Sequence, residues 1–178
     1  MTDSAAGGNS KMVTGLFKDS ESVERAYEVV TERDYGTADI NVVMSDDTRK
    51  RYFADDRQVN TDLGRKIEEG GELGGPTGGR IGMAIPAIIA IGVVALPGLG
   101  FILAGPLAVA LGAAGAAGLA VGLVGALSDW GIPEERAAHY EQGIHDGCIL
   151  MGVRPRSDDD ARYFVQRWKA IGAQHLHS

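Results

Sequence analysis

Residues 12–45, MVTGLFKDSESVERAYEVVTERDYGTADINVVMS, predict a strand, a helix and a second strand in succession. The first six residues are apolar and β-branched, which is typical of a strand. Asp19 or Ser20 is the expected N-cap of the helix, and Gly36 is expected to end it. Its buried face would carry apolar residues three and four positions apart, namely Val23, Ala26, Tyr27 and Val30. Residues 38–45 alternate in polarity and predict the second strand.

The same pattern returns near the C-terminus. Residues 148–154, CILMGVR, predict a strand, and SDDD from Ser157 onward resembles a helix start with its cap. Gly172 is expected to end this helix, and residues 174–177 to form a last edge strand. Its predicted buried face consists of Ala161, Phe164, Val165, Trp168 and Ile171. Two βαβ units in one sheet predict an α+β fold, a ferredoxin-like βαββαβ sandwich with both helices on one sheet face.

A long insert would split this sandwich between its second and third strands. Residues 1–11 are expected to be a flexible tail and 12–45 the first half of the sandwich. Residues 46–79 read as a polar and glycine-rich spacer, followed by an apolar block at 80–129. Residues 130–178 would supply the second half, preceded by a connecting helix. That helix would begin at Pro133, end at Gly147 and turn three residues inward: Ala137, Tyr140 and Ile144.

The apolar block predicts a hairpin of two helices. It has no ionisable side chain between Arg80 and Asp129, and the Pro-Gly-Leu-Gly sequence at 97–100 divides it into two arms. As helices, residues 81–96 would be about 24 Å long and residues 106–127 about 33 Å long. A bilayer core is about 30 Å thick, so the second arm is long enough to span it and the first is marginal.

The second arm carries small residues at every fourth position: Ala110, Ala114, Gly118, Gly122 and Ala126. Such a row lets helix backbones approach closely, so it predicts a glycine-zipper interface between copies of the chain. Arg80 and Trp130 flank the block as expected membrane-interface anchors. The main expectation is a homo-oligomer inserted in the cytoplasmic membrane through a transmembrane helical hairpin, with its α/β part in the cytoplasm. The alternative is a soluble, cytoplasmic ring or filament that buries the hairpins in a shared core.

Several of these segments together resemble a known family. They are VTGLFKDSESVERAYEVV, INVVMSDD, the glycine-rich apolar core, GIPEERAAHYEQGIHDG and CILMGVRP. In this order the chain is similar, over residues 12–173, to the bacterial general stress proteins, also labelled heat-induced or low-temperature-induced proteins. The resemblance implies a ferredoxin-like α/β part, a hydrophobic insert rich in alanine and glycine, and an association with stress. It implies no reaction and no catalytic residues.

Composition and motifs point away from most kinds of chemistry. A net charge of −7 and a pI near 5.0 argue against a nucleic-acid-binding basic face. The single cysteine, Cys148, excludes an internal disulfide and reads as a buried structural thiol, with His145 close in sequence. His175 and His177 have no third metal ligand at suitable spacing, and Asp158–Asp160 read as helix-start acids.

The sequence therefore predicts a non-enzymatic protein with no catalytic residue, no cofactor and no metal site. No small-molecule ligand is identified either. A further alternative is a small-ligand sensor that uses the sheet face which the two sandwich helices leave open.

Overall fold

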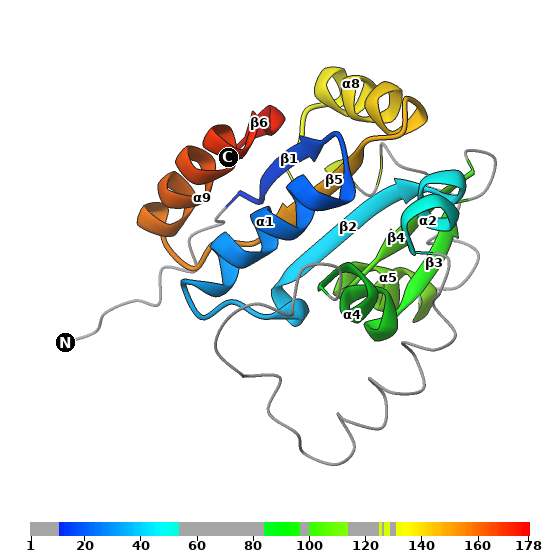
Figure 1. Cartoon of the computed structure of the whole chain (residues 1–178), viewed down its shortest axis with the longest axis horizontal. Helices are drawn as coiled ribbons and strands as arrows, with labels where there is room; N and C mark the ends of the chain where they lie inside the picture. The colour runs from blue at the N-terminus through cyan, green and yellow to red at the C-terminus, as the bar shows by residue number, and fades with distance from the viewer. Residues whose placement is uncertain (1–10, 54–83, 97–99, 114–124, 126, 129–130) are drawn as a thin grey trace, which may run out of the picture.

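The computed structural model describes residues 11–53, 84–96, 100–113, 125, 127–128 and 131–178, and within them the chain forms a mixed α/β structure (Figure 1). Its strands are β1 Val13–Phe17, β2 Ile40–Ser45, β3 Val93–Leu96, β4 Phe101–Ala104, β5 Ile149–Val153 and β6 Gln174–His177. The helices within the described ranges are α1 Ser20–Thr31, α2 Asp46–Phe53, α4 Ala84–Ile91, α5 Pro106–Ala113, α8 Glu134–His145 and α9 Asp158–Ile171, with a 3-10 turn η1 at Thr37–Asp39. The six strands make one antiparallel sheet in the order β3-β4-β2-β5-β1-β6.

Both predicted strand-helix-strand units are confirmed as local structure. The side chain of Asp19 caps α1 by accepting a hydrogen bond from the Ser22 N–H at 2.8 Å. Ser157 caps α9 in the same way, with the Asp160 N–H donating at 3.1 Å. The left-handed conformation of Gly172, at φ 98°, ends α9 as predicted. β1-α1-β2 and β5-α9-β6 are therefore set by sequence signals at their own ends.

The predicted end of the first helix is wrong. α1 stops at Thr31, and Asp34 takes the left-handed conformation with φ 60°. Gly36 lies beyond this turn and precedes η1 as its N-cap. An aspartate tolerates the left-handed region better than most residues, so this helix ends without a glycine.

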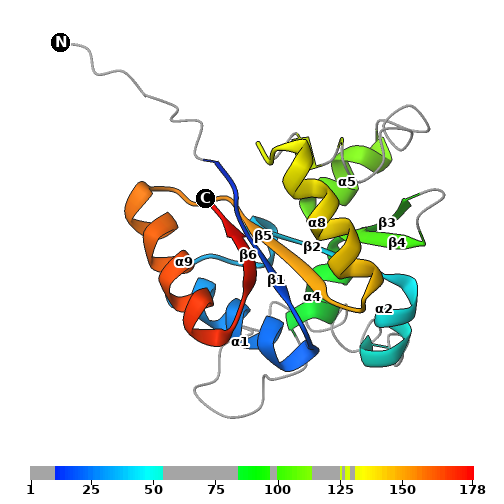
Figure 2. The ribbon, with the colours of Figure 1, turned by 90° about the horizontal axis from the view of Figure 1, so that it is seen from above.

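Helices cover both faces of the sheet (Figure 2). α1, α9 and α4 lie on one face, where β1, β2 and β5 contribute buried residues that include Val13, Phe17, Ile40, Met44 and Met151. α8 and α5 lie on the other face, over Leu16, Val43, Leu103 and Leu150. The predicted inward residues of α8 are all fully buried, namely Ala137, Tyr140 and Ile144. α1 and α9 share one face as predicted, but the opposite face, expected to be open, is covered.

The first arm of the apolar block is not the single helix that the sequence predicts. In the first arm, α4 ends at Ile91, and Val93–Leu96 is the strand β3. β4 pairs with β2, with Val42 opposite Ala104 and Ser45 opposite Phe101, and β3 pairs with β4. Gly92 interrupts the helix, and the β-branched Val93 and Val94 favour a strand that can satisfy its backbone on the edge of the sheet.

The second arm begins at Pro106 as predicted, where α5 starts, and α5 is described as far as Ala113. Most of the residues that follow in this arm lie outside the described ranges. Among the described residues, no helix has the length and apolar character needed to cross a bilayer.

Candidate functional site

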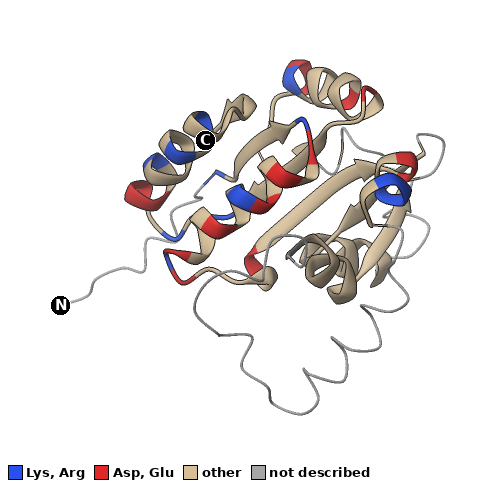
Figure 3. Ribbon diagram, viewed as in Figure 1, with Lys and Arg blue, Asp and Glu red and all other residues tan. Residues whose placement is uncertain are grey.

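The four elements α4, β3, β4 and α5, residues 84–96 and 100–113, form what we call the apolar module. No side chain in these residues can ionise, and Figure 3 shows the module as a continuous uncharged region beside charged helices. Three of the four large apolar side chains that are most exposed among the described residues belong to it: Ile91 at 38%, Val93 at 48% and Val109 at 50%. An exposed apolar surface of this kind marks an interaction site more often than a catalytic one.

Two buried polar side chains from the first half of the chain anchor this module. Glu24 in α1, with 3% of its surface exposed, accepts a hydrogen bond from the Ile85 N–H at 3.3 Å. Asn41 in β2, with 6% exposed, accepts one from the Leu107 N–H at 2.9 Å through its Oδ1 atom. The first N–H groups of a helix have no acceptor within the helix. Glu24 and Asn41 therefore supply acceptors to the first turns of α4 and α5.

Two glycines allow the backbone of the module to pack closely. Gly105 has a φ of 113°, and a Cβ atom there would lie 2.5 Å from the carbonyl oxygen of Ile40. A Cβ atom on Gly92 would lie 2.6 Å from the Cγ2 atom of Val109. The approach of the module to β2, and of α5 to the start of β3, therefore depends on the absence of side chains at these two positions.

Among the strands that the structure describes, β3 lies at one end of the sheet and has β4 as its hydrogen-bonded neighbour. The Gly105 N–H donates to the Gly92 carbonyl at 3.0 Å, in the register that also places Val93 opposite Ala104. Residues in an antiparallel pair alternate between those that bond across the pair and those that face away. The backbone groups of Val94 and Leu96 therefore bond to β4, whereas those of Val93 and Ala95 point out of the sheet.

The opposite end of the sheet, β6, is protected. Its pairing with β1 shifts register between Thr14 and Leu16, and His175 has a φ of 50°. The Tyr140 hydroxyl donates to the His175 carbonyl at 2.5 Å, and Arg136 Nη1 donates to the Leu176 carbonyl at 2.9 Å. Irregular pairing and polar coverage are the usual means of preventing a sheet edge from pairing further. β3 consists of four apolar residues in regular register, and within the described part of the chain it shows none of these features.

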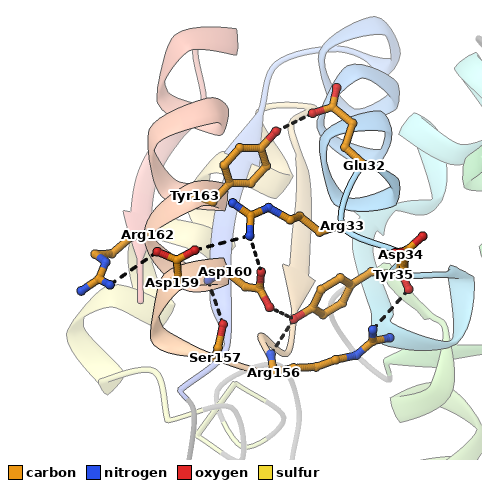
Figure 4. A network of polar contacts seen from close by, with 10 residues as sticks. All are labelled: Glu32, Arg33, Asp34, Tyr35, Arg156, Ser157, Asp159, Asp160, Arg162 and Tyr163. Carbon is orange, nitrogen blue, oxygen red and sulfur yellow. Dashed lines mark hydrogen bonds and ion pairs between the residues drawn. The ribbon is translucent and has the colours of Figure 1, made fainter.

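A separate polar cluster joins the two halves of the fold at the loops after α1 and before α9 (Figure 4). At its centre is the buried Tyr35, whose hydroxyl donates to Asp160 Oδ2 at 2.8 Å and accepts from the Arg156 backbone N–H at 2.5 Å. The Arg156 guanidinium lies 4.1 Å from the centre of the Tyr35 ring, and the Phe164 ring meets it edge-on. Burial of the phenol raises the pKa of Tyr35, and the hydrogen bond to Asp160 adds to the effect.

The outer part of this cluster consists of ion pairs and stacked groups. Arg33 Nη1 lies 3.2 Å from Asp160 Oδ1 and 3.4 Å from Asp159 Oδ2, and its guanidinium covers the Tyr163 ring at 4.2 Å (Figure 4). The Tyr163 hydroxyl donates to Glu32. Each arginine in the cluster contacts an acidic side chain, since Arg156 pairs with Asp39 and Arg162 with Asp159. Because its cations are already paired with acidic side chains of the same chain, we interpret the cluster as a structural contact between the two halves of the fold.

The structure places the predicted interface residues only in part. Ala110 lies in α5 and is exposed, while Leu107 and Leu111 of the same helix pack against the core. The remaining positions lie outside the described residues: Ala114, Gly118, Gly122, Ala126, Arg80 and Trp130. The glycine zipper and the membrane anchors therefore stay predictions.

The residues considered for chemistry have structural surroundings. The His145 ring packs on Phe101, with ring centres 4.6 Å apart. Cys148 is half-buried, and burial raises the pKa of its thiol, which lowers the fraction of reactive thiolate at neutral pH. Asp158, Asp159 and Asp160 lie in the first turn of α9, as predicted. Within the described residues, no group of three or more His, Cys, Asp or Glu side chains is arranged to hold a metal ion.

Comparison of the chain with protein-family models, with curated proteins and with solved structures finds no match. The assignment of a function therefore depends on the geometry of the chain itself.

The β3 edge is the feature that the sequence analysis missed. The signal lies in VVALPGLGFILA, residues 93–104, where two short apolar runs flank a Pro-Gly pair. Pro-Gly between apolar runs is typical of a turn joining two strands. Short apolar runs fit a helix and a strand equally well, so the length of the uncharged block favoured the helical interpretation.

Proposed function

We propose that this protein is non-catalytic and works by associating with copies of itself through the apolar module. The observation that carries this proposal is the exposed, uncharged edge at β3, flanked by Ile91 and Val109. Burying apolar surface contributes about 25 cal/mol for each Å² removed from water, so contact between two such edges is favourable. The sequence analysis also predicts a homo-oligomer, which agrees with self-association.

Charge supports a second copy of the chain as the partner. The whole chain carries a net charge of −7, so most surfaces of two copies repel one another at low ionic strength. The apolar module carries no ionisable group, so two copies can meet there without bringing like charges together (Figure 3).

The proposal includes a ferredoxin-like core to which the module is attached. Its support is the order β2-β5-β1-β6, in which each strand-helix-strand unit leaves a gap that a strand of the other unit fills. β4 and β3 would then be additions to the β2 edge. The association with stress is part of the same proposal and comes from the family resemblance.

Sedimentation velocity of the full chain without detergent, over a concentration series, tests the proposal. We expect a defined species whose mass is a multiple of 18.7 kDa. The double variant Val93→Lys/Val109→Lys should shift this species to the monomer, because it places charges on two exposed apolar positions. Tyr52→Ser is the matched control, since Tyr52 is an exposed apolar residue in α2, outside the module, and should leave the assembly unchanged.

Two outcomes would count against this function. A wild-type chain that stays monomeric throughout the series removes the basis for self-association. A monomer that floats with phospholipid vesicles would instead favour the membrane-inserted alternative.

A further inference from the structure

We infer that the contact is a continuation of the β-sheet, in which β3 pairs antiparallel with β3 of a second copy about a two-fold axis at Val94. This inference rests on the proposed self-association and specifies its geometry. The contact would join two six-stranded sheets into one continuous sheet.

The free hydrogen-bonding groups of β3 determine the register. Val93 and Ala95 point their N–H and C=O groups out of the sheet, as the Gly105–Gly92 hydrogen bond establishes for this ladder. In the proposed strand pair, a residue whose N–H and C=O groups point out of its own sheet must lie opposite a residue of the second copy whose groups also point outward. Placing Val93 opposite Ala95 of the second copy, and Ala95 opposite its Val93, satisfies all of these groups. Val94 then faces its own equivalent across the axis. A two-fold axis at Val93 or at Ala95 would leave some of the outward-pointing N–H and C=O groups without a partner in Val93–Leu96 of the second copy.

The side chains agree with this register. Val93 and Ala95 share a sheet face with Ala104 and Ile102, their neighbours across the β3–β4 pair. Both are exposed, Val93 at 48% of its surface. In the proposed pair, Ala95 of the second copy lies directly beside Val93 on that face and covers it. Valine beside alanine is small enough for the two strands to reach ordinary spacing.

The β3 edge of the sheet is better suited to pair with a second copy than the β6 edge is. β6 carries a register shift, a residue with positive φ and side-chain hydrogen bonds to its His175 and Leu176 carbonyls. β3 has no charge, proline or register shift between Val93 and Leu96, and these are the features that keep exposed edges from pairing. An isologous contact needs a surface that complements itself, and an antiparallel strand edge meets that condition.

A cysteine at the axis provides the test. In the Cys148→Ala background, which removes the single native cysteine, Val94→Cys would place two thiols on a non-hydrogen-bonded pair. The Cα atoms of such a pair lie about 4.5 Å apart, which is within the range of about 4.4–6.8 Å for disulfides. Mild oxidation should therefore convert most of the protein to a covalent dimer on a non-reducing gel.

Val93→Cys in the same background is the matched control. Strands lie about 4.8 Å apart and rise about 3.4 Å per residue, so a shift of two residues separates the Val93 positions of the two copies by about 8 Å. This distance exceeds the reach of a disulfide, so we expect little covalent dimer. Dimer from Val93→Cys in preference to Val94→Cys would overturn the register.

A second test removes a hydrogen-bond donor from the outer edge. Ala95→Pro deletes an N–H that points away from β4 and leaves the β3–β4 ladder intact. We expect this variant to sediment as a monomer with an unchanged circular dichroism spectrum. Val93→Lys alone should give the same result, whereas Val109→Lys on α5 should leave the dimer in place. The Val93→Lys result decides the question if the proline variant fails to fold.

Different outcomes would contradict the β3 contact and self-association in general. If the wild type associates but Val94→Cys does not cross-link and Val93→Lys remains associated, copies meet through another surface. The inference is then wrong while the proposed function stands. If the wild type is monomeric, both are wrong.

Discussion

The carboxylate of Glu24 in α1 accepts a hydrogen bond at 3.3 Å from the backbone N–H of Ile85, which lies 61 positions later at the start of α4. This contact ties the apolar module to the first helix of the fold. It is buried, since 3% of the Glu24 surface is exposed.

Glu24→Ala should therefore lower the free energy of unfolding by about 1–3 kcal/mol, because it removes an acceptor from a buried N–H group. Glu24→Gln keeps an oxygen acceptor of nearly the same shape and should cost less. Glu28→Ala, at an exposed position of the same helix, is the control and should stay within about 0.5 kcal/mol of the wild type. Urea denaturation of the three variants measures these differences. Equal stability of Glu24→Ala and Glu28→Ala would show that the Glu24 contact does not hold the module.

Asn41 gives a second prediction, for the other end of the module. Its Oδ1 atom accepts from the Leu107 N–H at 2.9 Å, across 66 positions of sequence. Asn41→Ala should cost about 1–2 kcal/mol, in the range of lost helix caps. The effect should be local. Compared with the wild type, amide hydrogen exchange in the variant should become faster at the start of α5 and change less in β5. Uniform loss of protection across the sheet would contradict a capping role.

The sequence predicts those parts of the fold whose signals are local. Asp19, Ser157 and Gly172 mark helix ends by their own side chains or conformations, and the structure confirms all three. The sequence predicts a helix at β3 because a short apolar run such as Gly92-Val93-Val94 fits a helix and a strand equally well. The run forms a strand because it pairs with β4. Local sequence patterns do not predict the residues that anchor the module, because Glu24 and Asn41 accept hydrogen bonds from residues 61 and 66 positions away.

Tyr35 supports a prediction for alkaline pH. Burial raises the pKa of its phenol above that of an unfolded tyrosine, so the folded protein holds this proton more tightly. The resulting stability is fully present below the unfolded pKa of about 10 and is lost as pH rises above it toward the folded pKa. Burial raises the pKa of Tyr140 in the same direction, so the wild-type free energy of unfolding should fall above about pH 10.

Tyr35→Phe separates the two tyrosines. At neutral pH it should cost about 1–3 kcal/mol, because Asp160 loses a donor and the Arg156 N–H loses an acceptor. Above about pH 10 its stability should fall less steeply than that of the wild type, since one of the raised pKa values is gone. Denaturation midpoints from pH 8 to pH 11 measure both effects. A parallel decline in the two proteins would assign the alkaline loss to Tyr140 and other groups.

His177 in β6 leads to the last prediction, for mildly acidic pH. Its Nε2 atom is buried, with no hydrogen-bond partner among the described residues. Burial lowers the pKa of the ring, with a smaller contribution from Arg136, against an opposing hydrogen bond to the Gly131 backbone. A lowered folded pKa contributes stability that is present above the unfolded pKa of about 6.5 and is lost as pH falls through the folded value. The free energy of unfolding should therefore decline below about pH 6.5 in the wild type and less in His177→Asn. If His177→Asn declines as steeply as the wild type, protonation of another group destabilises the fold.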